Sequence, residues 1–382
     1  MEDRRTVILP YLDGWRGLAI IAVLVCHFGP RPAVGWVGDY GVQMFFALSG
    51  FLMGQLLFVK KVALPDFFFR RFSRIFPAFL LFVSAMYVYA RYFQPSRYEA
   101  PLEELLATTF FLRTYFPDQI SIWSNNWPIG NVWSLNVEEH SYIFLAVLAL
   151  IARKLKSDRV ASVLLVSSIA SSVAIYFFYS SSPPTGASPW QLRSECAAIG
   201  LLFSATLSQL RLFYQPVVSP STSTIAVCLL MLLSAFLISA YRMRGGKIVF
   251  APILLALALN FLHFLPELAK TALSNPLLLW FGKCSFSLYL WQQPFYTAVQ
   301  KAGFPTLLGL ALAILTAALS FKFVEDPLRI GLNRRWGRFR EKRAARFSPA
   351  SEATLADDGV QAARPGEDTL PSISTQQPTN GS

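Results

Sequence analysis

The chain has 382 residues, of which 54% are hydrophobic and 15% are charged, and its mean hydropathy is +0.44. Soluble domains usually carry about a quarter charged residues, so this composition excludes an ordinary soluble fold and indicates a polytopic membrane protein. The net charge of +12 does not indicate nucleic-acid binding, because the basic residues cluster at the ends of apolar runs. The four cysteines stand singly in apolar stretches and predict neither a disulfide framework nor a metal site.

A membrane span needs about 20 mostly apolar residues, and the sequence predicts ten such helices and an all-α integral membrane fold. The expected spans are 11–29, 37–59, 75–93, 133–152, 159–179, 190–210, 222–241, 247–265, 276–299 and 304–324. The apolar stretch 102–116 is short and carries three charges, so we expect it to lie in the interface or to re-enter. Ten spans place both termini and most basic loops in the cytoplasm, and of the basic loops only 241–247 falls outside.

The predicted domain organisation is one transmembrane domain over residues 1–340, followed by a disordered cytoplasmic tail over 341–382. Few apolar residues and many Ser, Pro, Thr, Asp and Gln residues prevent the tail from burying enough surface to fold. The first apolar segment is expected to remain as a span rather than to be removed as a signal peptide, because Asp13 and Arg16 interrupt it.

Arg16 and His27 lie within this first span. Their separation of eleven residues is about three helical turns, so they share one helix face roughly 16 Å apart along the axis. Ionisable groups inside a membrane are costly and usually functional, and a histidine titrates near neutral pH, which makes His27 a candidate proton-transfer group. The alternatives are a structural hydrogen bond from His27 to a neighbouring helix and, for Arg16, a local ion pair with Asp13 or snorkelling.

The segment NVWSLNVEEHSYIF, residues 131–144, opens the fourth predicted span at the same membrane side as His27. Glu138 is therefore expected at a depth comparable to that of His27, where a carboxylate could orient the imidazole for acid–base chemistry. Consecutive helical residues point about 100° apart, so only one of Glu138, Glu139 and His140 need face inward. The alternative is an interfacial polar cluster at the mouth of the helix.

Aromatic and basic residues alternate in FFFRRFSRIFP, residues 67–77, directly before a predicted span. Arg71 and Arg74 are three positions apart and can reach one ligand from the same helix face. Guanidinium groups suit phosphate, so an anionic cofactor such as a coenzyme A nucleotide is plausible at this site. The alternative is ordinary anchoring to lipid headgroups.

Two further segments predict packing or helix termination. The pair Gly50 and Gly54 has the GxxxG spacing that allows close helix approach. In FVEDPLR, residues 323–329, Pro327 is expected to end the last span. Glu325 and Arg329 would then lie at the cytoplasmic face, where they either support the basic patch or simply stop the span.

Taken in order, LDGWRGLAIIAVLVCHF, GVQMFFALSGFL, RRFSRIFP, VWSLNVEEHSY, FGKCSFSLYLWQQPF and FVEDPLR resemble the acyltransferase 3 family of integral membrane O-acyltransferases, which includes O-antigen acetyltransferases. The resemblance covers roughly residues 10–330. It implies that Arg16 and His27 are the functional pair of the first span, that Arg71 and Arg74 are the RxxR element of the donor side, and that Glu138 is the acidic residue after Trp133-Ser134-Leu135. Family members often carry a histidine where this chain has Gln292, so His27 becomes the principal base.

The sequence thus predicts a multi-pass O-acyltransferase of the bacterial inner membrane that uses acetyl-CoA as acyl donor and no metal. The acceptor would be a hydroxyl of a lipid-linked or surface glycan, with lipopolysaccharide among the candidates. His27, Glu138 and Arg16 are the expected catalytic residues, and Arg71 and Arg74 the expected acetyl-CoA ligands.

The rival hypothesis is a transporter or flippase of a glycan or anionic substrate, which would use the same embedded charges as a relay. Against it, the sequence shows no inverted repeat and no matching pair of broken helices. A non-catalytic scaffold is the third alternative.

Overall fold

The computed structural model describes residues 9–30, 33–93, 101–123, 127–214, 217–240 and 246–347. The chain divides into two compact units, Met1–Asn333 and Arg334–Ser382, and every site described below belongs to the first unit. The described residues contain helices and irregular segments but no strand, which confirms the all-α prediction.

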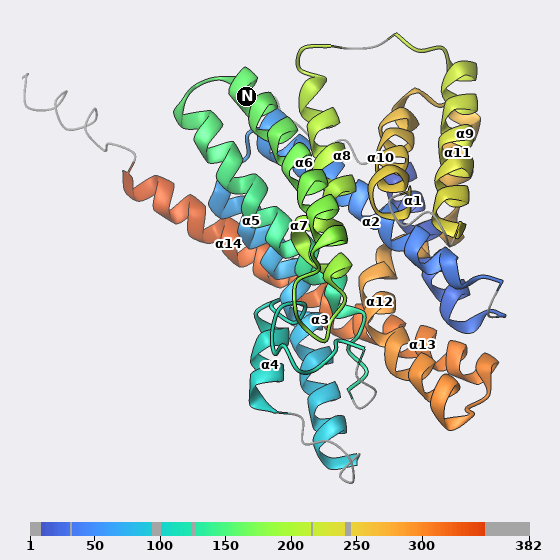
Figure 1. Cartoon of the computed structure of the whole chain (residues 1–382). Helices are drawn as coiled ribbons and strands as arrows, with labels where there is room; N and C mark the ends of the chain where they lie inside the picture. Colours follow the sequence, from blue (N-terminus) through green and yellow to red (C-terminus); the bar gives the residue numbers. More distant parts are fainter. Residues whose placement is uncertain are drawn as a thin grey trace, which may run out of the picture. The chain divides into compact units, whose positions relative to one another are not determined.

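The α-helices are labelled in chain order (Figure 1). They are α1 (Pro10–Phe28), α2 (Gly35–Gly54), α3 (Leu64–Phe93), α4 (Leu102–Thr109), α5 (Val132–Lys154), α6 (Asp158–Ser181), α7 (Ser194–Ala197), α8 (Ile199–Leu210), α9 (Pro220–Ser239), α10 (Ala251–Phe261), α11 (Glu267–Leu273), α12 (Pro276–Ala302), α13 (Thr306–Ser320) and α14 (Asp326–Phe347). Short π-turns extend three of them, namely η1 (Gln55–Val59) after α2, η3 (Gly246–Phe250) before α10 and η5 (Phe321–Glu325) after α13. Two 3-10 turns, η2 (Trp190–Leu192) and η4 (Leu262–Phe264), complete the order.

Eight helical stretches in the described residues are long and apolar enough to cross a membrane, which confirms a multi-pass membrane protein. The other two predicted spans correspond to α8 and α12. The helix α8 has only 12 residues, whereas α12 has 27 residues but is less apolar than the eight stretches above. The number ten and the orientation of the termini stay predictions. The eight residues of α4 extend only about 12 Å, so the stretch 102–116 is too short to span, as expected.

Helices from the two ends of the first unit lie side by side at its centre. The helix α1 packs along both α2 and α12, and Figure 1 shows the blue N-terminal helices beside the orange α12. On α2, a Cβ added to Gly50 would overlap the carbonyl oxygen of Leu201, and one added to Gly54 would lie 2.7 Å from that of Ala205. The two glycines therefore let α2 approach the backbone of α8, which confirms their predicted packing role.

Two predicted helix boundaries are wrong. The helix α3 begins at Leu64, so Arg71 and Arg74 lie inside a 30-residue helix that also includes Pro77, not before a span that starts at residue 75. Pro327 does not end the helical segment either. The π-turn Phe321–Glu325 precedes it and α14 starts at Asp326, so Pro327 occupies a first helical turn, where its missing N–H is not needed. Of the predicted tail, residues 341–347 belong to α14 and residues 348–382 lie outside the described residues.

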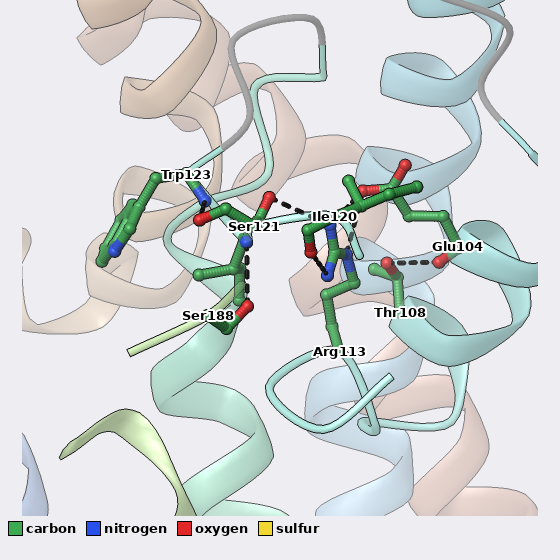
Figure 2. A network of polar contacts seen from close by, with 8 residues as sticks. Glu104, Thr108, Arg113, Ile120, Ser121, Trp123 and Ser188 are labelled. Carbon is green, nitrogen blue, oxygen red and sulfur yellow. Dashed lines mark hydrogen bonds and ion pairs between the residues drawn. The ribbon is translucent and has the colours of Figure 1, made fainter. Parts of the chain in front are cut away.

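A buried ion pair holds the irregular segment after α4 (Figure 2). The Arg113 guanidinium contacts the Glu104 carboxylate, with Nε 2.9 Å from Oε1, and both side chains are fully buried. Its other nitrogens donate to the carbonyl oxygens of Ile120 and Ser121 at 3.0 and 3.1 Å. Each of these partners of the Arg113 guanidinium comes from residues 104–121, so the contacts hold this segment together.

Candidate active site

Three arginines from two helices line one cavity inside the first unit. Arg16 comes from α1, whereas Arg71 and Arg74 come from α3, and the cavity has a volume of about 80 Å³. We call it the arginine cavity. Its other polar lining residues are Ser49, Ser134, Glu138, Tyr142, Ser285 and Tyr289. Four of the five predicted site residues, Arg16, Arg71, Arg74 and Glu138, thus share one site.

The three guanidinium groups differ in the partners that the protein gives them. Arg16 donates to Asp13 at 2.7 Å, so the local ion pair that the sequence left as an alternative is present. Arg71 lies over the ring of Tyr142, with 4.8 Å between the guanidinium carbon and the ring centroid. Arg74 makes no hydrogen bond or ion pair with any described residue, although the carboxylate of Glu325 attracts it at longer range. Arg16 and Arg71 repel Arg74, so an anion that enters the cavity would relieve an existing repulsion.

Glu138 belongs to this cavity and not to His27. Its carboxylate accepts a hydrogen bond from the hydroxyl of Ser49 at 2.7 Å and one from Tyr142 at 3.0 Å. The predicted Glu138–His27 pair is therefore wrong. The reason is depth: α5 begins at Val132, so Glu138 lies about 9 Å inside the helix, whereas His27 is the penultimate residue of α1.

Gln292 takes the partner role that we predicted for Glu138. The Nδ1 atom of His27 lies 2.5 Å from Oε1 of Gln292, and the imidazole stacks on the ring of Tyr296 with 4.3 Å between centroids. The amide nitrogen of Gln292 donates to the carbonyl of Tyr289 at 3.2 Å, which turns its oxygen toward the imidazole. An amide oxygen can only accept, so the proton of the neutral ring sits on Nδ1 and Nε2 is the basic nitrogen.

A hydrogen-bonded layer that includes Ser134 and Tyr289 links the arginine cavity with His27 through Gln292. The Tyr289 hydroxyl accepts from Ser134 at 2.7 Å and donates to the carbonyl of Asn131 at 3.0 Å. Tyr289 and Ser134 line the cavity, and Gln292 follows Tyr289 by about one turn of α12. Arg16 and His27 share a face of α1, as predicted, but only Arg16 lines the cavity, while His27 contacts Gln292.

Sequence reasoning missed three polar residues of the site. Ser49 precedes Gly50 and is indistinguishable in sequence from a small packing residue. Tyr142 stands four positions after Glu138, a spacing that places both on one helix face and could have identified it. Gln292 differs from the family pattern and was given no role. His140 points elsewhere, with Nδ1 2.8 Å from the hydroxyl of Ser194, which is consistent with only one of residues 138–140 facing the cavity.

No metal site stands out in the described parts of the chain. They contain no group of three His, Cys, Asp or Glu side chains that could hold a metal ion, and no disulfide joins any of the four cysteines within the described residues. The chemistry of the arginine cavity is that of an anion site with one carboxylate and several hydroxyl groups.

A multi-pass helical bundle with a cationic cavity in its interior matches a known class of membrane enzyme. The model of the acyltransferase domain family (Acyl_transf_3) matches residues 9–324, most of the chain. The chain belongs to this family, which confirms the resemblance predicted from the motifs.

Similar proteins carry related names. The chain is 27% identical over 354 residues to the peptidoglycan O-acetyltransferase OatA of Listeria monocytogenes, covering 84% of this chain and 56% of that protein. It is 27% identical over 357 residues to the putative peptidoglycan O-acetyltransferase YrhL of Bacillus subtilis (84% and 55%), and 25% identical over 349 residues to a putative O-acetyltransferase of Staphylococcus aureus (84% and 57%). The chain thus spans little more than half the length of these relatives. No solved structure gives a significant match.

Proposed function

We propose that this protein is an acyltransferase that moves an acetyl group from acetyl-CoA to a hydroxyl of a cell-envelope glycan. The observation that carries the proposal is the convergence of Arg16, Arg71 and Arg74 on one cavity, with Arg74 unpaired among the described residues. The names of the relatives favour a cell-wall glycan over lipopolysaccharide as the acceptor. Because acetyl-CoA is made in the cytoplasm, the enzyme would work in the bacterial inner membrane.

The donor would bind with its phosphates on Arg71 and Arg74. Planar guanidinium groups form paired hydrogen bonds to phosphate oxygens, and the interior of the protein screens them little. The arginine cavity of about 80 Å³ is too small for a whole coenzyme A, so it would take the phosphates while the pantetheine arm carries the thioester out of the cavity toward His27. Arg16, held by Asp13, would then stabilise negative charge on the donor.

His27 is the proposed general base. The acceptor oxygen attacks the thioester carbonyl while its proton passes to Nε2 of His27, and the intermediate collapses to an ester and the coenzyme A thiolate, which takes up a proton. Gln292 holds Nδ1 as the proton-bearing nitrogen, so Nε2 keeps its lone pair for this step. Glu138 supports the donor side, because its charge interacts with that of Arg16.

Membrane vesicles that contain the full chain and receive labelled acetyl-CoA test this function. We expect label in the glycan fraction, its loss in the Arg71→Ala/Arg74→Ala double variant and its retention in Arg70→Ala. Arg70 is the matched control, because it is an exposed arginine of the same helix and does not line the cavity. Movement of unlabelled glycan across the membrane with no ester formed would support the transporter hypothesis and contradict the proposal.

A further inference from the structure

A second and much larger cavity lies beside the arginine cavity. It has a volume of about 1440 Å³, and its walls come from the first half of α2, from α5, α6 and α9, and from the turns η2 and η3. Several aromatic residues line it, with Trp36, Trp133, Tyr176, Phe177 and Trp190 among them. We call it the aromatic cavity. The proposed transfer chemistry makes no use of it.

We propose that the aromatic cavity binds the acceptor in the form of a lipid-linked saccharide, an inference that rests on the proposed glycan acetyltransferase function. The sugar would lie against the tryptophans, and the lipid tail would lie along the apolar side chains of α6, α9 and η3. A lipid-linked saccharide has both a ring that stacks on aromatic groups and a tail that needs an apolar wall.

The sugar end of the cavity combines aromatic faces with a few polar groups. Trp133 packs edge-on against Phe46, and Trp190 packs against Tyr176 with 5.6 Å between ring centroids, so the aromatic groups are held in place. Rigid aromatic walls with a few convergent polar groups are typical of sites for small organic ligands. The polar groups are the Asp39–Lys247 ion pair and Gln43, whose Oε1 is buried with no hydrogen-bond partner among the described residues.

Part of the lining is apolar and exposed. Phe177 and Phe250 each line it and are each 57% exposed, and Leu237 and Ile238 extend the apolar surface on α9. Sites for small ligands usually measure about 300–1,000 Å³, so a cavity of about 1440 Å³ leaves room beyond a short saccharide. Within a membrane bundle, the occupant that fits the remaining apolar volume is a lipid chain.

The two cavities share one lining residue. This shared residue connects the proposed acceptor site with the proposed donor site. Val42 lines both, and the consecutive residues Trp133 and Ser134 of α5 line the aromatic and the arginine cavity respectively. A sugar hydroxyl that passes Val42 would reach the Ser134–Tyr289 layer, and the carbonyl of Tyr289 holds Gln292, the partner of His27. The acceptor would therefore enter between the donor and the base.

Neighbouring phenylalanines of α6 provide a matched test of the lipid wall. Phe177 lines the cavity and Phe178 does not, yet the two are similarly exposed at 57% and 63%. The measurement is acetyl transfer from labelled acetyl-CoA by the full chain in nanodiscs, with an undecaprenyl-linked disaccharide as acceptor. We expect Phe177→Asn to raise the KM for this acceptor at least fivefold and Phe178→Asn to leave it unchanged. Equal KM values in the two variants would overturn the proposal, as would a soluble oligosaccharide that saturates at the same concentration.

Val42 tests the junction between the cavities. A Val42→Trp substitution is expected to lower acetyl transfer at least tenfold, because it blocks the junction that both cavities share, and unchanged transfer would contradict the proposed route. To separate the two hypotheses, binding of the undecaprenyl-linked disaccharide is measured without acetyl-CoA. Weaker binding in Phe177→Asn than in Phe178→Asn supports the acceptor site even if no acetyl transfer occurs, whereas equal binding overturns it. Absence of acetyl-CoA binding by the unsubstituted protein counts against the proposed function alone.

Discussion

Two regions of this protein hold buried or half-buried arginines, and they treat the charge in opposite ways. Arg113 has a fully buried side chain, and a carboxylate and two backbone carbonyls bind its guanidinium. Arg74 faces a cavity, has two other arginines nearby and makes no hydrogen bond or ion pair with the described residues. In both regions, removal of the charge from water is costly. A buried arginine that the protein itself saturates stabilises the fold, whereas one that faces a cavity beside like charges indicates a ligand.

Breaking the ion pair of Arg113 tests the comparison between Arg113 and Arg74 most strongly. Glu104→Ala leaves the Arg113 guanidinium buried without its carboxylate, a change that typically costs about 3–5 kcal/mol. We expect a large fall in the thermal unfolding temperature of the protein in detergent, and no such fall for Arg74→Ala. The double variant Glu104→Leu/Arg113→Met should recover part of the lost stability, because well-packed apolar groups can replace a buried ion pair. A similar loss of stability in Glu104→Ala and Arg74→Ala would contradict the distinction between a structural and a ligand-binding arginine.

His27 tests whether base and donor site are separate. We expect His27→Gln to lower kcat for acetyl transfer by about 10²–10⁴-fold, the usual contribution of a general base. Its affinity for acetyl-CoA should not change, because His27 does not line the arginine cavity. His263→Gln serves as the control, since His263 lines neither cavity. Full transfer activity in His27→Gln would reject the base assignment.

Gln292 is expected to have a smaller effect through the orientation of His27. Gln292→Leu removes the hydrogen bond between Gln292 and Nδ1 of the imidazole, and the loss of one hydrogen bond costs about 1 kcal/mol. We expect kcat to fall about tenfold at an unchanged KM for acetyl-CoA, and Gln292→Glu, which keeps an acceptor oxygen, to retain more activity than Gln292→Leu. Equal kcat values for these two variants, with only a common loss of thermal stability, would indicate a purely structural residue.

Tyr142 should show the smallest effect, on the donor side. Tyr142→Phe keeps the ring beneath Arg71 but removes the hydroxyl that contacts Glu138 and Ser49. Loss of one hydrogen bond of about 1 kcal/mol predicts a severalfold rise in the KM for acetyl-CoA at a nearly constant kcat. Steady-state kinetics distinguish this result from a fall in kcat, which would place Tyr142 at the reacting atoms instead.

Helical periodicity explains what could be predicted from the sequence. Arg16 and His27 share a face of α1, and Arg71 and Arg74 share a face of α3, because spacing within one helix determines both pairs. The chemistry of arginine then predicts an anion site. The closeness of Gly50 and Gly54 to another helix was also predictable, although the identity of that helix was not.

The contacts between helices could not be predicted in this way. His27 and Gln292 are separated by 265 positions, and their contact depends on how far α12 slides along α1, which local spacing does not determine. The same uncertainty led to the wrong partner for Glu138. The prediction used the position of the end of α5 and not the depth of Glu138 within that helix. Pro327 was misjudged for a related reason, since a π-turn before it changes the helical register.

Binding of acetyl-CoA to the arginine cavity is the central claim, and equilibrium binding tests it most directly. The measurement uses labelled acetyl-CoA and the full chain in nanodiscs, with the unsubstituted protein, Arg74→Ala and Arg70→Ala compared at equal thermal stability. We predict saturable binding that is at least tenfold weaker in Arg74→Ala and unchanged in Arg70→Ala. Equal affinities for all three proteins would contradict the account.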